Sequence, residues 1–332
     1  MSSQHHTKTN VNRRNPASMA VSDAMKKALS SRPTPTVQSV NTATPGTYHE
    51  WLDLIQKTNA EQKKKIKNMR KAFAVTVSKE IINGVTVRVV TPEHISPEFK
   101  DHVYIDVHGG AFVFFKGLPS IEEGILIAAR LGIKVICIDY RMPPLAPFPA
   151  PSDDIFSVYM ALLNTYSAKR ILLGGTSAGA SLVLVLVQRL VSEALPRPAA
   201  IYVGTPWADL TKTGDTLYTN EGIDRVLVTY DGILEAAAKL YAGKMALDHP
   251  GISPLYGAFE EFPPTFLLSG TRDMFLSDTV RVNRQLRNAG IRTTLDIYEG
   301  LSHADYLVAH DTPESCSSYA EIKQFFIACL GA

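Results

Sequence analysis

The sequence predicts an α/β fold in which helices cover both faces of a mostly parallel sheet. From residue 103 onward, short continuous runs of apolar residues alternate with segments of helical periodicity. Strands that are apolar throughout are typical of parallel sheets buried on both sides. The chain has 332 residues, 45% of them hydrophobic, which suits one large domain or two ordinary ones and excludes a chain that is disordered throughout.

The N-terminal part of the chain lacks this alternation of apolar runs and helical segments. Residues 1–45 are polar, rich in Ser, Thr, Asn and Pro, and without hydrophobic periodicity, so we expect a loose arm. Apolar residues then recur at helical spacing from Tyr48 to Phe73, which predicts a helix. The lysine-rich run at 63–67 is interpreted as a solvated face of that helix, the alternative being a patch for phosphate or membrane.

A β-hairpin is expected at the start of the sheet. β-Branched residues cluster in Val75–Val77 and Val85–Val90, with the turn signal Asn83-Gly84 between them. This pattern predicts two antiparallel strands at one edge of the sheet.

The remaining elements alternate in order. The expected strands are Val103–Val107, Val135–Asp139, Ile171–Gly174, Ala199–Val203, Thr265–Leu268 and Thr293–Tyr298. The expected helices are Ser120–Leu131, Pro151–Tyr166, Ala180–Ala194, Asp278–Ala289 and Tyr319–Cys329. The alternation stops between Thr205 and Tyr256, where a helix at Asp231–Tyr241 lies inside a long insertion. Insertions of this kind are usually lids or binding loops.

Charge and missing motifs argue against several classes of protein. Thirty-four basic and 32 acidic residues give a net charge of +2, which argues against a nucleic-acid binder. No glycine-rich nucleotide motif is present, and the three cysteines form no CxxC pair or zinc spacing. We therefore expect no cofactor and no metal. Without a signal peptide or an apolar run of about 20 residues, we expect a cytoplasmic protein with no membrane span.

The strongest chemical signal is Gly175-Thr176-Ser177-Ala178-Gly179, between an apolar strand and an apolar helix. This is the context of a nucleophile elbow, a turn so tight that the residues flanking the serine must be small. The elbow holds the serine at a helix N-terminus, where free N–H groups and the helix dipole favour a developing anion. Ser177 is therefore the predicted nucleophile.

A second signal is His108-Gly109-Gly110, directly after the strand Val103–Val107. Adjacent glycines allow bare N–H groups to point into a site. Together with the N–H of Ala178, those of Gly109 and Gly110 are expected to form an oxyanion hole. The alternative is an ordinary glycine turn.

A nucleophilic serine needs a base, and the base needs an acid to orient it. His303 and Asp273 both follow expected strands, near the sheet edge where open α/β sheets keep their sites. The other histidines lie in the arm, before strands, in the insertion or beyond His303. Asp278 is the rival acid, but it suits the start of the next helix better.

Several motifs in order resemble the hormone-sensitive-lipase-like, bacterial family IV esterases of the α/β-hydrolase superfamily. Besides the elbow and the His108 turn, the motifs are Asp139-Tyr140-Arg141-Met142-Pro143-Pro144, Pro206-Trp207-Ala208-Asp209-Leu210, Ser253-Pro254-Leu255, Gly270-Thr271-Arg272-Asp273 and Ser302-His303. The resemblance implies an α/β-hydrolase fold with a helical cap and a Ser177, His303 and Asp273 triad. Thr176 replaces the acid common in the elbow, as in a GTSAG subgroup of the family, and Met274-Phe275 replaces the usual Pro-Leu.

The resemblance also implies a domain organisation. Residues 46–74 and 209–250 would form the cap, and residues 75–208 and 251–332 the catalytic domain. We expect His108, Phe112, Tyr140 and Leu301 to contact the substrate. Phe114 and Phe115 are interpreted as core residues, with a place in the acyl pocket as the alternative, and Trp207 as support for its loop. The resemblance also implies a homodimer through the last strand and helix, about Thr293 to Cys329.

The residues and the resemblance together predict a serine carboxylesterase that acts on small-molecule esters through an acyl-enzyme, and the resemblance implies a preference for short-chain esters. A lactone, amide or carbamate hydrolase with the same triad is the alternative. A non-catalytic ligand-binding protein on the same fold is a remoter one, and the presence of all three triad residues argues against it.

Overall fold

A computed structural model describes residues 18–31 and 34–331 of the chain. Its centre is an eight-stranded sheet with the order β1-β2-β4-β3-β5-β6-β7-β8. β2 runs antiparallel to both β1 and β4, and all the other neighbours are parallel. The strands are β1 (Val75–Ile82), β2 (Val85–Pro92), β3 (Val103–Val107), β4 (Lys134–Ile138), β5 (Ile171–Thr176), β6 (Ala200–Gly204), β7 (Thr265–Gly270) and β8 (Thr293–Tyr298). The predicted mostly parallel sheet is confirmed.

The hairpin forms where the turn signal predicted it. Ile82 pairs with Val85, and the two residues between them, Asn83 and Gly84, have φ angles of 45° and 82°. Positive φ at both central residues is the geometry that matches the right-handed twist of a two-residue hairpin.

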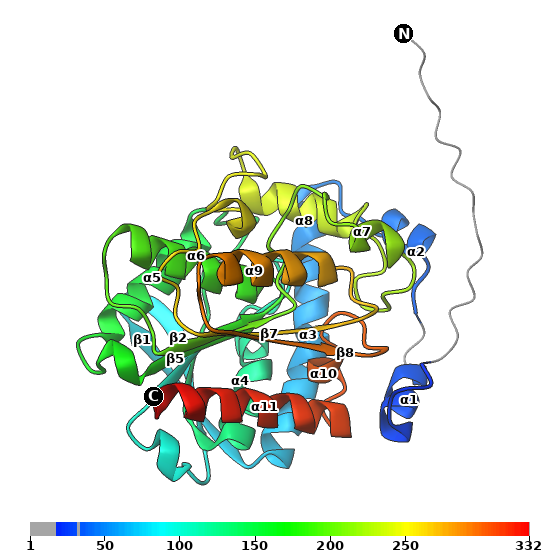
Figure 1. The fold of residues 1–332 in the computed structure, drawn as a ribbon. Helices are drawn as coiled ribbons and strands as arrows, with labels where there is room; N and C mark the ends of the chain where they lie inside the picture. The colour runs from blue at the N-terminus through cyan, green and yellow to red at the C-terminus, as the bar shows by residue number, and fades with distance from the viewer. Residues whose placement is uncertain (1–17, 32–33, 332) are drawn as a thin grey trace.

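Helices cover both faces of the sheet (Figure 1). One layer holds α5 (Ala150–Leu162), α6 (Ala178–Ser192) and α9 (Leu276–Asn288), and the other holds α3 (Tyr48–Ala72), α4 (Glu122–Ile127) and α11 (Pro313–Leu330). Successive strand residues point to opposite faces: Tyr104 belongs to the core under α11, and Ile105 belongs to the core under α6. The sheet therefore separates two hydrophobic cores.

Two expected helices differ most from their predicted limits. α11 begins at Pro313, six residues earlier than expected, because Thr312 caps it by accepting the Ser315 N–H and proline suits the first helical position. The helix expected at residues 120–131 is divided into a 3₁₀ turn, α4 and a π-helical turn at Ala128–Gly132.

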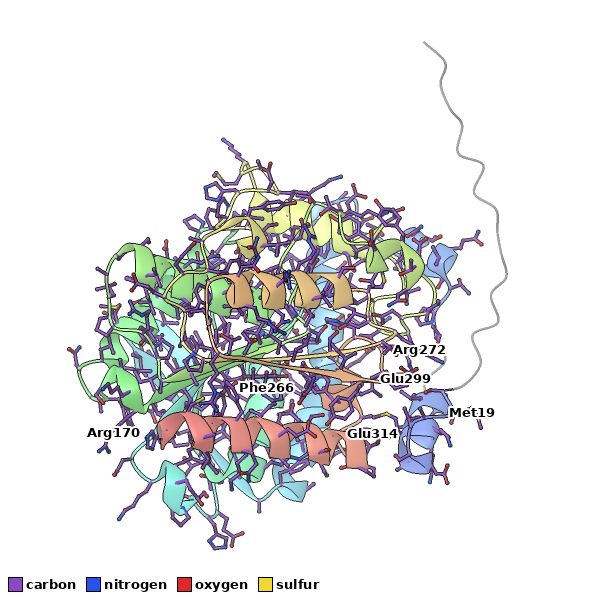
Figure 2. All side chains as sticks on the ribbon, in the orientation of Figure 1. Met19, Arg170, Phe266, Arg272, Glu299 and Glu314 are labelled. Atoms are coloured by element: carbon purple, nitrogen blue, oxygen red, sulfur yellow. The ribbon has the colours of Figure 1, made fainter. Side chains whose placement is uncertain are left out.

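Residues 18–31 and 34–45, expected to belong to a loose arm, instead contain α1 (Asp23–Ser30) and α2 (Val37–Thr42). The side chain of Met25 is fully buried, and Ser22 donates hydrogen bonds from its N–H and its Oγ to Glu314, labelled at the start of α11 in Figure 2. α1 thus docks onto the body of the protein through Met25, with Ala28 and Leu29 packed against the same core, and through the hydrogen bonds of Ser22 with Glu314. The rest of the expected arm, residues 1–17 and 32–33, lies outside the described residues.

The insertion after β6 carries α7 (Thr216–Thr219) and α8 (Ile233–Ala242), and α10 (Asp305–Val308) follows β8. α2, α7 and α8 gather at the top of the view in Figure 1, beside one end of α3. None of the helices in the described part of the chain combines the length and apolarity needed to cross a membrane.

Candidate active site

A cavity of about 480 Å³ lies at the carboxyl ends of the parallel strands. Ser177, His303, Gly109 and Gly110 all line it. Ser177 directly follows β5, the two glycines follow β3, and His303 lies in the loop after β8. Parallel strands bring these three loops, distant in the sequence, to a single edge of the sheet.

Ser177 occupies the strained turn expected of a nucleophile elbow. Its φ and ψ angles are 62° and −125°, and its N–H donates to the Gly204 carbonyl oxygen at 2.8 Å. A Cβ on Gly179 would lie only 1.9 Å from the Val107 carbonyl oxygen, so the elbow packs against the end of β3 with no room for a side chain. Close packing on β3 therefore explains the second glycine of the motif.

The glycine turn after β3 lies directly beside the serine. A Cβ on Gly109 would lie 3.2 Å from the Ser177 Cβ, and Gly110 has a φ of 106°, which glycine adopts readily. Ala178 is the first residue of α6, so its N–H has no acceptor within the helix. The structure thus brings together the three residues predicted to surround an oxyanion.

His303 and Asp273 form a buried pair, with His303 Nδ1 3.1 Å from Asp273 Oδ1. Burial alone lowers the pKa of His303, but the Asp273 charge and hydrogen bond outweigh it and raise that pKa above its usual value. Asp273 also accepts from Ser269 Oγ at 2.8 Å and from the Phe275 N–H at 2.8 Å. The rival acid, Asp278, instead accepts the Asp209 N–H at 2.9 Å.

Two residues at this pair were not predicted from the sequence. Thr205, just after β6, donates its hydroxyl to Asp273 and lies 2.8 Å from His303 Nδ1. Asp224, in the long insertion, accepts the N–H groups of Met274 at 2.9 Å and His303 at 3.3 Å. Only the position of Thr205 after a parallel strand could have suggested it, and no motif marks Asp224.

A buried polar network lies behind the nucleophile. Thr176 donates its hydroxyl to Glu123 Oε1 at 2.8 Å, and the Tyr319 hydroxyl donates to the same oxygen at 3.2 Å. Burial raises the pKa of Glu123 to about 7, although these hydroxyls partly oppose the shift. Thr176, which replaces the acid common in the family, therefore has a carboxyl group as its partner.

Of the four residues expected to contact the substrate, only His108 lines the cavity. Phe112 stacks on Tyr241 with ring centroids 4.0 Å apart, and Tyr140 stacks on His108 and donates its hydroxyl to the His108 carbonyl oxygen. Leu301 is buried in the core under α11. These three side chains lie behind the cavity wall because their rings and methyl groups pack into the body of the protein.

Neighbouring aromatic residues, rather than Phe112, line the cavity. Phe114 and Phe115, interpreted as core residues, line the cavity instead, as their alternative interpretation held. Trp207 also lines it while stacking on Phe275, with centroids 5.3 Å apart. Within residues 18–31 and 34–331, no group of three or more His, Cys, Asp and Glu side chains is arranged to hold a metal ion.

Comparisons with known proteins agree with this fold. A family model described as alpha/beta hydrolase fold matches residues 104–307. The chain is 30% identical over 223 residues to an esterase from Acinetobacter venetianus, covering 66% of this chain and 72% of that protein. It is also 30% identical to an acetyl-hydrolase from Streptomyces hygroscopicus over 223 residues, covering 66% of this chain and 73% of that protein.

Solved structures extend the likeness to nearly the whole chain. The crystal structure of an esterase matches with a TM-score of 0.93 and 43% identity, covering 95% of this chain and 97% of that one. An esterase from the bacterial hormone-sensitive lipase family matches with a TM-score of 0.80 and 26% identity, covering 94% and 100%. The chain belongs to the α/β-hydrolase family. Within that family it is a carboxylic ester hydrolase of the hormone-sensitive-lipase-like branch, as its motifs predicted.

Proposed function

We propose that the enzyme hydrolyses its ester through an acyl-enzyme on Ser177, with His303 as the base and Asp273 as the acid that orients it. The supporting observation is the buried contact of 3.1 Å between His303 Nδ1 and Asp273 Oδ1, on a histidine that shares a cavity wall with Ser177. Because Nδ1 faces the carboxylate, Nε2 is the nitrogen available to the serine.

The reaction then follows from these positions. Ser177 Oγ attacks the ester carbonyl carbon while His303 Nε2 takes the hydroxyl proton. The N–H groups of Gly109, Gly110 and Ala178 donate to the developing oxyanion. His303 returns the proton to the departing alcohol, and it then takes a proton from the water that hydrolyses the acyl-enzyme.

We further propose that residues 46–74 and 209–250 form a cap over a catalytic domain of residues 75–208 and 251–332. Gln62 on α3 and the segment Val226–Thr229 line the cavity, as does Val40 on α2. α2 therefore joins this cap. Capping excludes water from the site until it is needed.

A preference for short-chain esters is part of this proposal. The cavity of about 480 Å³ is walled mainly by apolar side chains, including Phe114, Leu234 and Leu307. Among the polar residues of the wall, Lys65 pairs with Glu122. A charged pair in the wall of an apolar cavity opposes the packing of a long alkyl chain against it, since the chain would desolvate the pair.

The test is hydrolysis of p-nitrophenyl esters from acetate to palmitate by the wild type and by Ser177→Ala. We expect kcat to fall by about four orders of magnitude or more in the variant, as for other serine triads. The wild type should be most active on the short chains. Activity retained by Ser177→Ala, or a maximum at palmitate, would contradict the proposal. Comparing kcat/KM for a linear ester, a lactone, an anilide and a carbamate distinguishes an esterase from a lactone, amide or carbamate hydrolase with the same triad.

We also propose that two copies of the chain associate through β8 and α11. β8 is an edge strand of the sheet, with β7 as its neighbour on one side. Edge strands expose backbone groups that can pair with another chain.

A further inference from the structure

Asp224 has an unusual number of backbone partners for a carboxylate outside the predicted triad. Its side chain is fully buried. Oδ1 accepts the N–H groups of Val226 at 2.8 Å and Leu227 at 3.0 Å. Oδ2 accepts those of Met274 at 2.9 Å and His303 at 3.3 Å. One carboxylate thus joins its own loop to the residue after Asp273 and to His303 itself.

The residues around Asp224 bind the acid turn as well. Asn220 donates its side-chain amide to the Asp273 carbonyl oxygen at 2.8 Å, and the Thr216 hydroxyl donates to the Met274 carbonyl oxygen at 2.8 Å. The backbone on both sides of the Asp273–Met274 peptide is therefore held by residues 216–224. The next few residues, Val226–Thr229, line the substrate cavity.

We propose that Asp224 is a positioning residue, through which the cap holds the turns of the acid and the base together. This inference rests on the proposed function. Asp224 fixes the backbone of Met274 and His303, so their side chains and that of Asp273 keep one relative orientation. A cap that moves away from the body would release both turns at once.

The charge of Asp224 adds a second effect on the base. The titratable groups that face Asp224 are Asp273 and His303. Burial, and then the charge of Asp273, raise the pKa of Asp224 to about 6. After Asp273, the negative charges of Asp224 and Asp305 help to raise the pKa of His303. Removing the Asp224 charge should therefore lower the pKa of His303 and extend activity to lower pH.

The experiment measures kcat, KM and the pH dependence of kcat/KM for Asp224→Asn, Asn220→Ala and Tyr230→Phe on a p-nitrophenyl ester. Tyr230→Phe is the matched control, because it removes a buried hydrogen bond to the Leu210 carbonyl oxygen within the same insertion. We expect Asp224→Asn to lose about 10- to 100-fold in kcat, since an amide oxygen cannot replace both carboxylate oxygens as acceptors. Its acid limb should shift to lower pH by about half a unit or more.

The other variants separate positioning from a loss of folded protein. Asn220→Ala should lose about 3- to 10-fold in kcat with KM nearly unchanged, and Tyr230→Phe should match the wild type. A loss of folded protein that does not depend on pH would lower kcat by the same factor at every pH. A loss of stability at acid pH would move the acid limb to higher pH, so neither produces the expected shift to lower pH. Far-UV circular dichroism reports whether each variant folds, and if Asp224→Asn does not, Asn220→Ala carries the test.

The outcomes distinguish this inference from the proposed function. A folded Asp224→Asn enzyme with wild-type kcat and an unmoved acid limb overturns the role of Asp224, while the triad stands. Wild-type kcat in Asn220→Ala likewise overturns the idea that residues 216–224 hold the acid turn. Activity retained by Ser177→Ala would overturn the proposed function itself.

Discussion

Glu123 is a carboxyl group buried next to the nucleophile turn, and the free energy of unfolding should depend on it. Burial raises its pKa from 4.5 to about 7 in the folded protein. Between these values the folded state binds more protons than the unfolded chain, so stability falls as pH rises through this window. We expect the free energy of unfolding of Glu123→Gln, relative to the wild type, to increase by about 3 kcal/mol from pH 4 to pH 8.

Urea unfolding at a series of pH values measures this difference. The matched control is Glu80→Gln, which removes the same charge from an exposed position on the hairpin. Its stability relative to the wild type should change much less over that range. If the difference in unfolding free energy between Glu123→Gln and the wild type did not change with pH, the pKa of Glu123 would not be raised in the folded protein.

Single residues of the site differ in how far the sequence could reveal them. Ser177 and Gly109 lie in tight turns, where backbone geometry restricts the residue types and leaves a motif. Asp224 meets His303 across 79 residues of chain, and such a contact leaves no local pattern. The direction of the Phe112 side chain also could not be predicted from the sequence. Ala111 and Phe112 have positive φ angles, so their side chains do not alternate as they would in a strand.

At the scale of elements, α2 should set the length of ester that the cavity accepts. Val40 on α2 lines the cavity. The start of α8 packs against α2, because a Cβ on Gly232 would lie 2.7 Å from Asn41 Oδ1. A larger side chain at position 40 would extend into the cavity. We expect Val40→Trp to lower kcat/KM for the octanoate ester by about tenfold or more and that for acetate by much less.

The p-nitrophenyl ester series again gives the measurement. Gln38→Trp is the control, since Gln38 is exposed on the same helix. Equal losses on acetate and octanoate in Val40→Trp would mean that α2 does not bound the chain-length pocket.

Elements with a marked apolar pattern were predicted, and the short helices α1 and α2 were not. The strands β3 to β7 and the helices α5, α6 and α9 bury apolar faces, and the spacing of their apolar residues shows this in the sequence. α1 and α2 have eight and six residues and few apolar side chains. Helices this short are not stable alone, so they form through contacts with α11 and α8, which no local pattern contains.

At the scale of the whole molecule, the proposed dimer can be tested at the two edges of the sheet. The sheet has two edges, β1 and β8, and each carries an exposed isoleucine: Ile81 is 71% exposed and Ile297 is 37% exposed. The proposed dimer uses β8, so light scattering should give about twice the chain mass of 36.4 kDa. A charge on a pairing edge strand opposes association. We therefore expect Ile297→Lys to weaken the dimer and Ile81→Lys, the matched change on the other edge, to leave it intact. Dissociation by Ile81→Lys alone would place the interface at β1, and a monomeric wild type would exclude the dimer altogether.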